Sequence, residues 1–362
     1  MVTDEDYMRR ALFHAARARA GTTPNPMVGA VVVSPDGLVV GQGRHLKAGG
    51  AHAEVHALDE AGERARGATI YVTLEPCCHH GRTAPCTQRV IASGVRRVVV
   101  AMSDPNPLVN GRGIAEMRAA GVQVEVGLLE REARTLNRGF IRVHTAGRPE
   151  VIVKAGVSAD GMIAEAPGHR TTISGPASWR RIHRLRAMVD AIAVGSETLL
   201  VDDPLLTARE SVRPRPLTRV VFDRRLRTPM TSALVRSVEE GPVLILTTAE
   251  AMAARPDQVE ALRRLGVTVV NGGASLAESL HALLAFDVST LLVEGGARLH
   301  RALLDADLVD QILLVTTPGR TLGPRGVPAF GTGDLSVGGR SPNRTASVGD
   351  DLWMEFDVHG NH

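Results

Sequence analysis

The 362-residue chain is poor in aromatic residues, and this scarcity bears on its ligands. Aromatic residues make up 3% of the sequence, too few to build the stacking platforms on which proteins hold single-stranded nucleic acid. The formal net charge is only +3, and no run of like charges marks a nucleic-acid partner. We therefore expect that the protein binds no nucleic acid.

Long apolar segments are also missing. No stretch reaches the roughly 20 apolar residues of a membrane-spanning helix, and the acidic residues 1–6 do not resemble a signal peptide. Three clustered cysteines do not form an extracellular disulfide framework. We therefore expect a cytoplasmic protein with no membrane partner. Its length and its 44% hydrophobic content fit two globular domains better than one core.

Lysine is nearly absent, because Lys47 and Lys154 are the only lysines beside a large number of arginines. Where Arg is the default cation, a Lys can mark a position that needs a compact ammonium with an adjustable pKa. Genomic composition is the simpler explanation of the same scarcity, so the surroundings of each lysine have to decide.

Alternating helix and strand patterns predict a layered α/β chain in two parts. In the first part we expect helices at 4–20, 52–66, 86–92, 114–120 and 128–143, and strands at 28–34, 38–43, 69–74, 95–101 and 122–126. Gly147 and Pro149 interrupt the pattern, so we expect domains at 1–147 and 148–362. In the second part we expect strands at 151–154, 191–194, 219–222, 243–246, 267–270, 290–293 and 311–316, helices at 177–188, 257–265, 276–284 and 298–304, and surface loops over 318–345.

The three cysteines, Cys77, Cys78 and Cys86, follow a His-x-Glu motif at His52 and Glu54. This is the layout of a zinc-dependent base deaminase. His52, Cys77 and Cys86 supply three zinc ligands and leave the fourth position to water. Glu54 is not a ligand and would move protons beside the metal. Cys86 opens a predicted helix, and a helix N-terminus favours a thiolate.

Two other functions also fit parts of the pattern. A structural zinc module on a non-enzymatic binding protein would use Cys78 or His79 as a fourth ligand, would leave Glu54 and Pro76 without a role, and would unfold when zinc is removed. A nucleoside or tRNA deaminase would keep the zinc chemistry beside an unrelated second domain. A tRNA enzyme needs a basic surface with aromatic residues, which this composition lacks.

Several segments carry a specific family resemblance. Residues 23–29 read TPNPMVG, residues 52–58 HAEVHAL, residues 74–83 LEPCCHHGRT and residues 104–107 DPNP. The second half adds SADG at 158–161, RLR at 184–186, DDPLLTAR at 202–209 and EGG at 294–296. Over nearly the whole chain these segments resemble the bifunctional deaminase/reductase family of riboflavin biosynthesis. The nine-residue step from Cys77 to Cys86 is that family's form of the zinc motif.

The resemblance implies a cytidine-deaminase-like three-layer α/β domain followed by a dihydrofolate-reductase-like α/β domain. The first would deaminate 2,5-diamino-6-(5-phosphoribosylamino)pyrimidin-4-one with one Zn²⁺. The second would reduce the ribosyl group to ribityl phosphate with NADPH. The partner implied is thus a small pyrimidine ribose phosphate, and we also expect a homo-oligomer.

The resemblance also implies roles for individual residues. The catalytic residues would be Glu54, Lys154 and Glu294. The substrate contacts would be Asn25, His79, Arg82, Asp104 and Asn106 in the deaminase, and Arg170, Arg186, Leu206, Arg209 and Glu294 in the reductase. The cofactor contacts would be Val157, Thr172, Thr198, Asp202, Gly295, Gly296, Ala297 and Arg298. From the residues alone, Asp104-Pro-Asn106-Pro is equally a turn, and Glu294-Gly295-Gly296 is a plain strand-to-helix turn.

Two departures from the family pattern stand near these sites. Cys78 occupies a position where the family usually has Ser, which places an extra thiol beside the presumed metal. Arg170 and Thr172 occupy positions where many relatives carry Ser and Trp, so the contact with the nicotinamide is expected to differ in detail.

Overall fold

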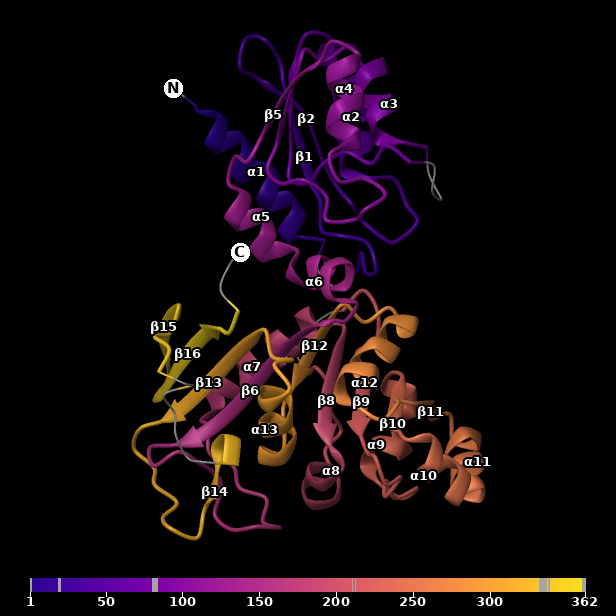
Figure 1. The fold of residues 1–362 in the computed structure, drawn as a ribbon. Coiled ribbons are helices and arrows are strands. Elements are labelled where there is room, and N and C mark those ends of the chain that lie inside the picture. Colours follow the sequence, from indigo (N-terminus) through magenta and orange to yellow (C-terminus); the bar gives the residue numbers. More distant parts are fainter. Residues whose placement is uncertain are drawn as a thin grey trace. The chain divides into compact units, whose positions relative to one another are not determined.

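The computed structural model describes residues 2–18, 21–79, 84–209, 211, 213–331, 337 and 339–359. The chain forms two compact units, Met1–Gly147 and Arg148–His362, and each has its own sheet and hydrophobic core (Figure 1). In these ranges no helix combines the length and the apolar composition that a bilayer crossing requires.

The first unit is a five-stranded sheet with helices on both faces (Figure 1). Its strand order is β2-β1-β3-β4-β5, with β1 antiparallel to β2 and β3, and β3, β4 and β5 parallel. The strands are β1 (Gly29–Val33), β2 (Val39–Arg44), β3 (Thr69–Val72), β4 (Arg97–Val100) and β5 (Gln123–Val126). The helices are α1 (Asp4–Ala16), α2 (Ala53–Ala61), α3 (Cys86–Ala92), α4 (Arg112–Ala119), α5 (Glu130–Leu136) and α6 (Arg138–Ala146). Helices α1 and α5 lie on one face, and α2, α3 and α4 on the other (Figure 1).

Two glycines on β2 allow α2 to lie directly on the sheet. A Cβ atom at Gly43 would lie 2.3 Å from the carbonyl oxygen of Ala53, and one at Gly41 would lie 2.0 Å from that of Ala57. Both oxygens belong to α2, so the helix contacts bare strand backbone. This contact fixes the start of α2, the segment that carries His52 and Glu54.

The second unit is built on a nine-stranded sheet of order β11-β10-β9-β8-β12-β6-β13-β16-β15. The strands from β11 to β13 are parallel, whereas β16 is antiparallel to β13 and to β15. The strands are β6 (Glu150–Ser158), β8 (Ala191–Gly195), β9 (Thr218–Phe222), β10 (Val243–Thr247), β11 (Thr268–Asn271), β12 (Thr290–Val293), β13 (Gln311–Thr317), β15 (Arg344–Val348) and β16 (Asp351–Asp357). Strands β7 (Met162–Ala164) and β14 (Val327–Pro328) form a separate pair.

The helices of the second unit connect these strands. They are α7 (Pro176–Met188), α8 (Ser196–Asp202), α9 (Ala233–Arg236), α10 (Ala249–Ala254), α11 (Pro256–Arg264), α12 (Leu276–Ala282) and α13 (Ala297–Asp305). The central strands are buried on both faces, as their continuous apolar runs predict. For example, Val151, Ile192 and Leu291 are fully buried.

The sequence pattern misplaced one helix in the first unit. It predicted a single helix over 128–143, but the chain forms α5 and α6 with a break at Asn137. The Asn137 side chain accepts a hydrogen bond from the Met27 amide at 2.8 Å and donates one to the Met27 carbonyl at 3.0 Å. This long-range pair of bonds attaches the break to the segment that carries Asn25.

Other differences concern short elements. The helix expected over 52–66 ends at Ala61 and continues as a 3-10 turn, Gly62–Ala65, because Gly62 has φ 55°. The sequence pattern did not predict β7, α8, α9, α10, β15 or β16, and the loops expected over 318–345 include β14 and the start of β15. Strand β16 contains alternating residues in DLWMEFD that could have indicated it.

Candidate functional site

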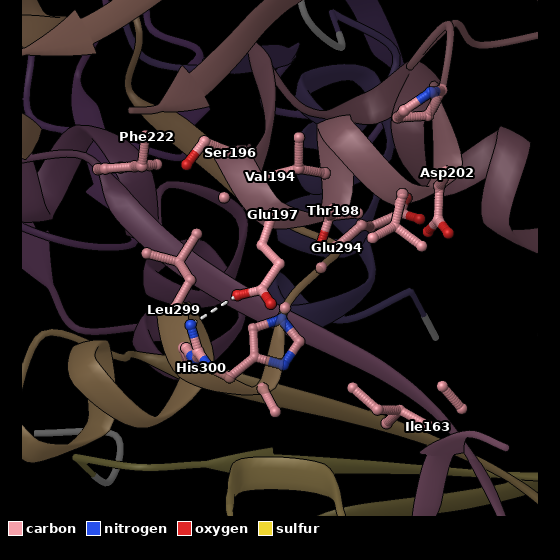
Figure 2. Close-up of a pocket in the computed structure, with 18 of the residues that line it drawn as sticks. Ile163, Val194, Ser196, Glu197, Thr198, Asp202, Phe222, Glu294, Leu299 and His300 are labelled. Carbon is pink, nitrogen blue, oxygen red and sulfur yellow. Dashed lines mark ion pairs between the residues drawn. The ribbon is translucent and has the colours of Figure 1, made fainter. Parts of the chain in front are cut away.

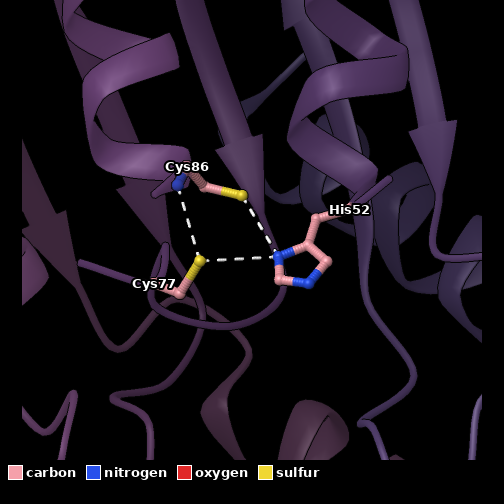
Figure 3. Close-up of side chains that lie close together, drawn as sticks. All are labelled: His52, Cys77 and Cys86. Atoms are coloured by element: carbon pink, nitrogen blue, oxygen red, sulfur yellow. Dashed lines mark hydrogen bonds between the residues drawn. The ribbon is translucent and has the colours of Figure 1, made fainter. Parts of the chain in front are cut away.

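The predicted zinc ligands meet in the first unit (Figure 3). His52 Nδ1 lies 3.2 Å from Cys86 Sγ and 3.5 Å from Cys77 Sγ, and the three ligand atoms all lie within 4.8 Å of one another. Two ligands bound to tetrahedral zinc, at the usual Zn–N and Zn–S lengths, would be about 3.6 Å apart. The three side chains therefore fit one zinc ion.

The local structure explains why these three side chains converge. His52 is the N-cap of α2, Cys86 is the first residue of α3, and Cys77 lies in the loop beyond the end of β3. The pKa of Cys77 is lowered to about 4, because the Cys86 thiol, and then the His52 ring and the Cys86 amide, hydrogen-bond to its sulfur. A thiolate is the form that binds metal.

A closed, four-ligand site finds no support among the described residues. Neither Cys78 nor His79 belongs to the cluster of ligand atoms, and Cys78 Sγ instead lies 3.9 Å from the Leu108 carbonyl oxygen. The three-ligand arrangement leaves one zinc position for water, as in catalytic sites.

Glu54 lies on the first turn of α2, beside these ligands, and is 3% exposed. Its Oε2 atom has no hydrogen-bond partner among the described residues. Burial raises the pKa of its carboxyl group, an effect that the charge of His52 partly offsets. Burying a carboxyl group with an unpaired oxygen destabilises the fold, so such a group indicates a functional role. Proton transfer to and from an adjacent water is a role that fits this position.

His45, which the sequence pattern did not single out, orients the predicted substrate residue Asn25. The Ala51 carbonyl lies 3.1 Å from His45 Nδ1 and can only accept, so Nδ1 carries the proton. His45 Nε2 therefore accepts from the Asn25 side-chain amide at 3.2 Å. This hydrogen bond fixes the orientation of the Asn25 side chain.

A buried carboxylate holds the segment with Asp104 and Asn106. Glu75 accepts hydrogen bonds from the backbone amides of Asp104, Gly111 and Ile114 at 3.2, 2.9 and 3.1 Å. Asp104 Oδ1 accepts from the Asn106 amide at 2.8 Å, which is the turn chemistry that the sequence also allowed. Burial raises the pKa of Asp104 to about 6. The roles of Asp104 and Asn106 in substrate binding stay predictions.

His79 and Arg82 are the two remaining residues predicted to contact the deaminase substrate. His79 is partly buried, and its Nδ1 atom has no partner within the described ranges. Arg82 lies outside the described residues.

The second unit contains a cavity of about 710 Å³ (Figure 2). Most of the residues predicted for reduction line it: Lys154, Arg170, Thr172, Arg186, Thr198, Asp202, Leu206, Glu294, Gly295, Gly296, Ala297 and Arg298. Val157 and Arg209 are not among the lining residues, since Val157 is buried in the core and Arg209 is exposed. Leu206 has φ 54°, a strained value for a branched residue that is common at ligand sites.

Arg186 and Glu294 hydrogen-bond to each other in this cavity. Arg186 donates two hydrogen bonds to Glu294, at 2.8 and 2.9 Å, and a third to the Thr207 carbonyl. Burial alone would raise the pKa of Glu294, but Arg186 outweighs burial and keeps it below its ordinary value. The predicted contact of Arg186 with a substrate phosphate stays a prediction, since its guanidinium is engaged here.

Lys154, on β6, forms no ion pair with any carboxylate in the described part of the chain. Burial lowers the pKa of its ammonium, and the nearby Glu294 only partly offsets this effect. From the sequence alone, genomic composition is the simpler explanation for the scarcity of lysine. The lowered pKa of Lys154 indicates instead that this position uses a lysine with an adjusted pKa.

The predicted cofactor segment joins β12 to α13. Gly295 lies against α8, where an added Cβ would be 2.8 Å from the Thr198 side chain. Thr198 and Asp202 are one helical turn apart on α8 and share a face. Arg298 forms an exposed ion pair with Glu197 at 2.9 Å, which contributes little by itself.

The sequence pattern missed several lining residues. Arg224, Arg225 and Arg227 follow β9 and line the cavity from an exposed loop. Trp179 on α7 supplies an aromatic surface in the cavity. His300 on α13 lines the cavity as well.

Comparison with protein families gives two matches. Residues 149–346 match the RibD C-terminal domain, and residues 1–102 match the cytidine and deoxycytidylate deaminase zinc-binding region. The riboflavin biosynthesis protein RibD of Aquifex aeolicus is 41% identical over 98% of this chain and 98% of its own length. That of Escherichia coli is 42% identical over 87% of this chain and 88% of its own.

Two solved structures have the same fold along nearly the whole chain. RibD of Acinetobacter baumannii superposes with a TM-score of 0.86 at 34% identity, over 98% of both chains. A diaminohydroxyphosphoribosylaminopyrimidine deaminase/5-amino-6-(5-phosphoribosylamino)uracil reductase of Thermotoga maritima gives 0.83 at 32% identity, also over 98% of both chains.

Proposed function

The chain belongs to the RibD family of riboflavin-biosynthesis proteins, and from this premise we propose that its two units act in turn on one pyrimidine phosphate. It is a bifunctional enzyme with a cytidine-deaminase-like domain and a dihydrofolate-reductase-like domain. The domain of residues 1–147 deaminates 2,5-diamino-6-(5-phosphoribosylamino)pyrimidin-4-one. The domain of residues 148–362 then reduces the ribosyl group to ribityl phosphate. Both activities appear in the name of the Thermotoga maritima relative.

The observation that carries the deaminase assignment is buried Glu54 beside the converging side chains of His52, Cys77 and Cys86. His52, Cys77 and Cys86 would hold a zinc ion, and the ion would supply the activation of water as a nucleophile. Glu54 accepts the proton of that water and donates protons to the ring nitrogen and to the departing ammonia. The raised pKa of Glu54 suits a group that must both accept and release protons.

Residues around the metal orient the pyrimidine. Asn25, held by His45, presents its carbonyl oxygen to the amino-bearing edge of the ring. Asp104, held by Glu75, and Asn106, held by Asp104, contact the opposite part of the substrate. These positions serve the substrate because each is fixed by a buried partner before the substrate arrives.

In the reductase domain the cavity would hold NADPH, and the cofactor would supply the hydride for the reduction. Lys154 lines the cavity and polarises the opened ribosyl group, because its ammonium forms no ion pair with a carboxylate among the described residues. Glu294 stays ionised through Arg186 and accepts a hydrogen bond from a ribosyl hydroxyl. The Gly295-Gly296 turn at the start of α13 receives the pyrophosphate, where helix amides favour negative charge.

The loop after β9 favours NADPH over NADH. Arg224 and Arg225 line the cavity and are exposed, so their guanidinium groups are accessible to the 2′-phosphate of NADPH. We expect the double variant Arg224→Ala/Arg225→Ala to raise the KM for NADPH by about tenfold or more. The KM for NADH should not change, and an equal rise for both nucleotides would contradict this assignment.

The experiment that tests the whole proposal uses the purified chain and the diaminopyrimidine phosphate. Ammonia release is followed first, and the absorbance of NADPH is followed second. We expect ammonia release without NADPH and NADPH oxidation only after deamination. Ammonia release from cytidine or from tRNA in its place, with no reaction of the phosphate, would overturn the substrate assignment.

A further inference from the structure

His300 is a buried histidine in the reductase domain whose ring nitrogens form no hydrogen bond of ordinary geometry with the described residues. It lies on the first turn of α13, is 2% exposed and lines the cavity (Figure 2). Neither Nδ1 nor Nε2 has a hydrogen-bond partner among the described residues. The ring of Phe330 packs beside it, with ring centroids 5.9 Å apart.

This arrangement is costly for a residue that only fills space. A buried polar group without a partner loses its hydration and gains nothing in return. The other buried position of α13 is Leu303, so an apolar side chain suits this face of the helix. A ligand that hydrogen-bonds to both ring nitrogens of His300 would explain why a histidine occupies this buried position.

The charge state of His300 limits the chemistry of such a ligand. Burial, and then the positive charge of Lys154, lower the pKa of His300 to about 4. The Val293 carbonyl and Glu294 act in the opposite direction but less strongly. The ring is therefore neutral at physiological pH and offers one donor and one acceptor. This pair matches a carboxamide or a hydroxyl group, and matches a phosphate poorly.

The position of His300 indicates which part of the ligand it meets. It follows the Gly295-Gly296 turn by one helical turn, and both Lys154 and Glu294 are near enough to influence its charge. Given the proposed function, we propose that His300 hydrogen-bonds a neutral donor–acceptor group where cofactor and substrate meet. The group is either the nicotinamide carboxamide of NADPH or a hydroxyl of the opened ribosyl chain.

The test compares two variants of the full-length chain, His300→Leu and His300→Asn. Leu keeps the apolar volume and removes both polar atoms, whereas Asn keeps a donor and an acceptor. We expect His300→Leu to weaken one ligand by about tenfold and His300→Asn to restore most of that loss. A change in the Kd of NADPH, measured by fluorescence without substrate, identifies the carboxamide. A change only in the KM of the deaminated substrate identifies the hydroxyl.

Thermal unfolding separates a ligand contact from a packing role. If His300 serves a ligand, ligand-free His300→Leu unfolds at the same temperature as the wild type or higher, because an unpaired polar group has been removed. Added NADPH plus substrate should then stabilise the variant less than the wild type. A lower unfolding temperature without ligand, or unchanged Kd and KM, would overturn the role of His300.

The same experiment keeps this inference apart from the proposed function. If the wild type oxidises NADPH and His300→Leu binds its ligands as the wild type does, the role of His300 is refuted and the reductase assignment stands. A wild-type chain that neither binds nor oxidises NADPH refutes the reductase assignment, and the inference with it.

Discussion

Unpaired polar atoms mark both sites at the scale of single residues. Glu54 Oε2 beside the zinc ligands and both ring nitrogens of His300 in the reductase cavity are buried without a partner in the described part of the chain. Buried polar groups are nearly always hydrogen-bonded, so each exception needs a reason. In both places the reason offered is a ligand that brings the missing hydrogen bonds.

Glu54→Gln should abolish deamination and leave the rest of the molecule intact. Gln cannot exchange protons, so we expect ammonia release to fall by about 10²- to 10⁴-fold. Zinc content, measured by atomic absorption, and reduction of the deaminated substrate should be unchanged. Glu63→Gln, in the exposed 3-10 turn after α2, is the matched control. Ammonia release at the normal rate in Glu54→Gln would exclude Glu54 as the proton shuttle.

His300 should make the stability of the reductase domain depend on pH. Its pKa falls from 6.5 to about 4 on folding, so the folded state resists protonation more than the unfolded chain does. The contribution of neutral His300 to the free energy of unfolding is fully present above pH 6.5 and is lost as the pH falls toward 4. Between pH 7.5 and pH 5 the wild type should lose about 2 kcal/mol more than His300→Leu.

Urea unfolding of the second unit at the two pH values measures this difference. His281→Leu, at an exposed position of α12, is the control and should follow the wild type. Equal losses in the wild type and in His300→Leu would mean that His300 titrates normally in the folded chain.

At the scale of elements, the contact of β2 with α2 connects packing to catalysis. In Gly43→Ala the new methyl group would overlap the Ala53 carbonyl, so the start of α2 must move. We expect a loss of about 1–3 kcal/mol in stability and at least a tenfold loss of ammonia release, because small displacements of catalytic groups are costly.

Thermal unfolding and the ammonia assay test this expectation, with Gly319→Ala as the control, since a Cβ there meets no atom within 4 Å. A Gly43→Ala variant with wild-type stability and rate would show that α2 tolerates the shift. Loss of stability without loss of rate would show that Glu54 does not depend on this contact.

The sequence predicted the longer elements well, because their apolar periodicity reflects burial against one core. The parallel strands β6, β8, β9, β10, β11 and β12 are examples, and so are α3 and the start of α2. It missed α8 and β16, since α8 is short and β16 shares its sheet with strands distant in sequence. A local sequence pattern does not contain information about pairing with strands that are distant in the chain.

The candidate sites also contain residues that the sequence predicted and residues that it missed. The convergence of His52, Cys77 and Cys86 could be predicted, because a metal restricts residue type and spacing. His45 and Asn137 could not, since each acts through a contact with the segment before β1 that only the fold creates. His300 could not be predicted either, because a histidine in a helix is unremarkable until its surroundings are known.

At the scale of the whole molecule, each site is built from residues of one unit. The zinc cluster lies in Met1–Gly147, and every residue that lines the cavity lies in Arg148–His362. A mixture of Glu54→Gln and Lys154→Met chains should therefore convert the diaminopyrimidine phosphate to the reduced product. Neither variant alone should do so.

NADPH absorbance in the mixture, with a lag while the deaminated intermediate accumulates, measures this complementation. Each single variant under the same conditions is the control. An inactive mixture would show that the intermediate does not reach a second chain through solution.

The scarcity of lysine has a consequence for the chemistry of covalent labelling. Each unit contains one lysine side chain, the exposed Lys47 in the first and Lys154 in the second. Burial lowers the pKa of Lys154, so more of this amine is unprotonated and nucleophilic near neutral pH. An amine-selective reagent small enough to enter the cavity should therefore modify the reductase domain at one side chain. Bound nucleotide should protect it, and peptide mass spectrometry would then report occupancy of the cavity without any turnover.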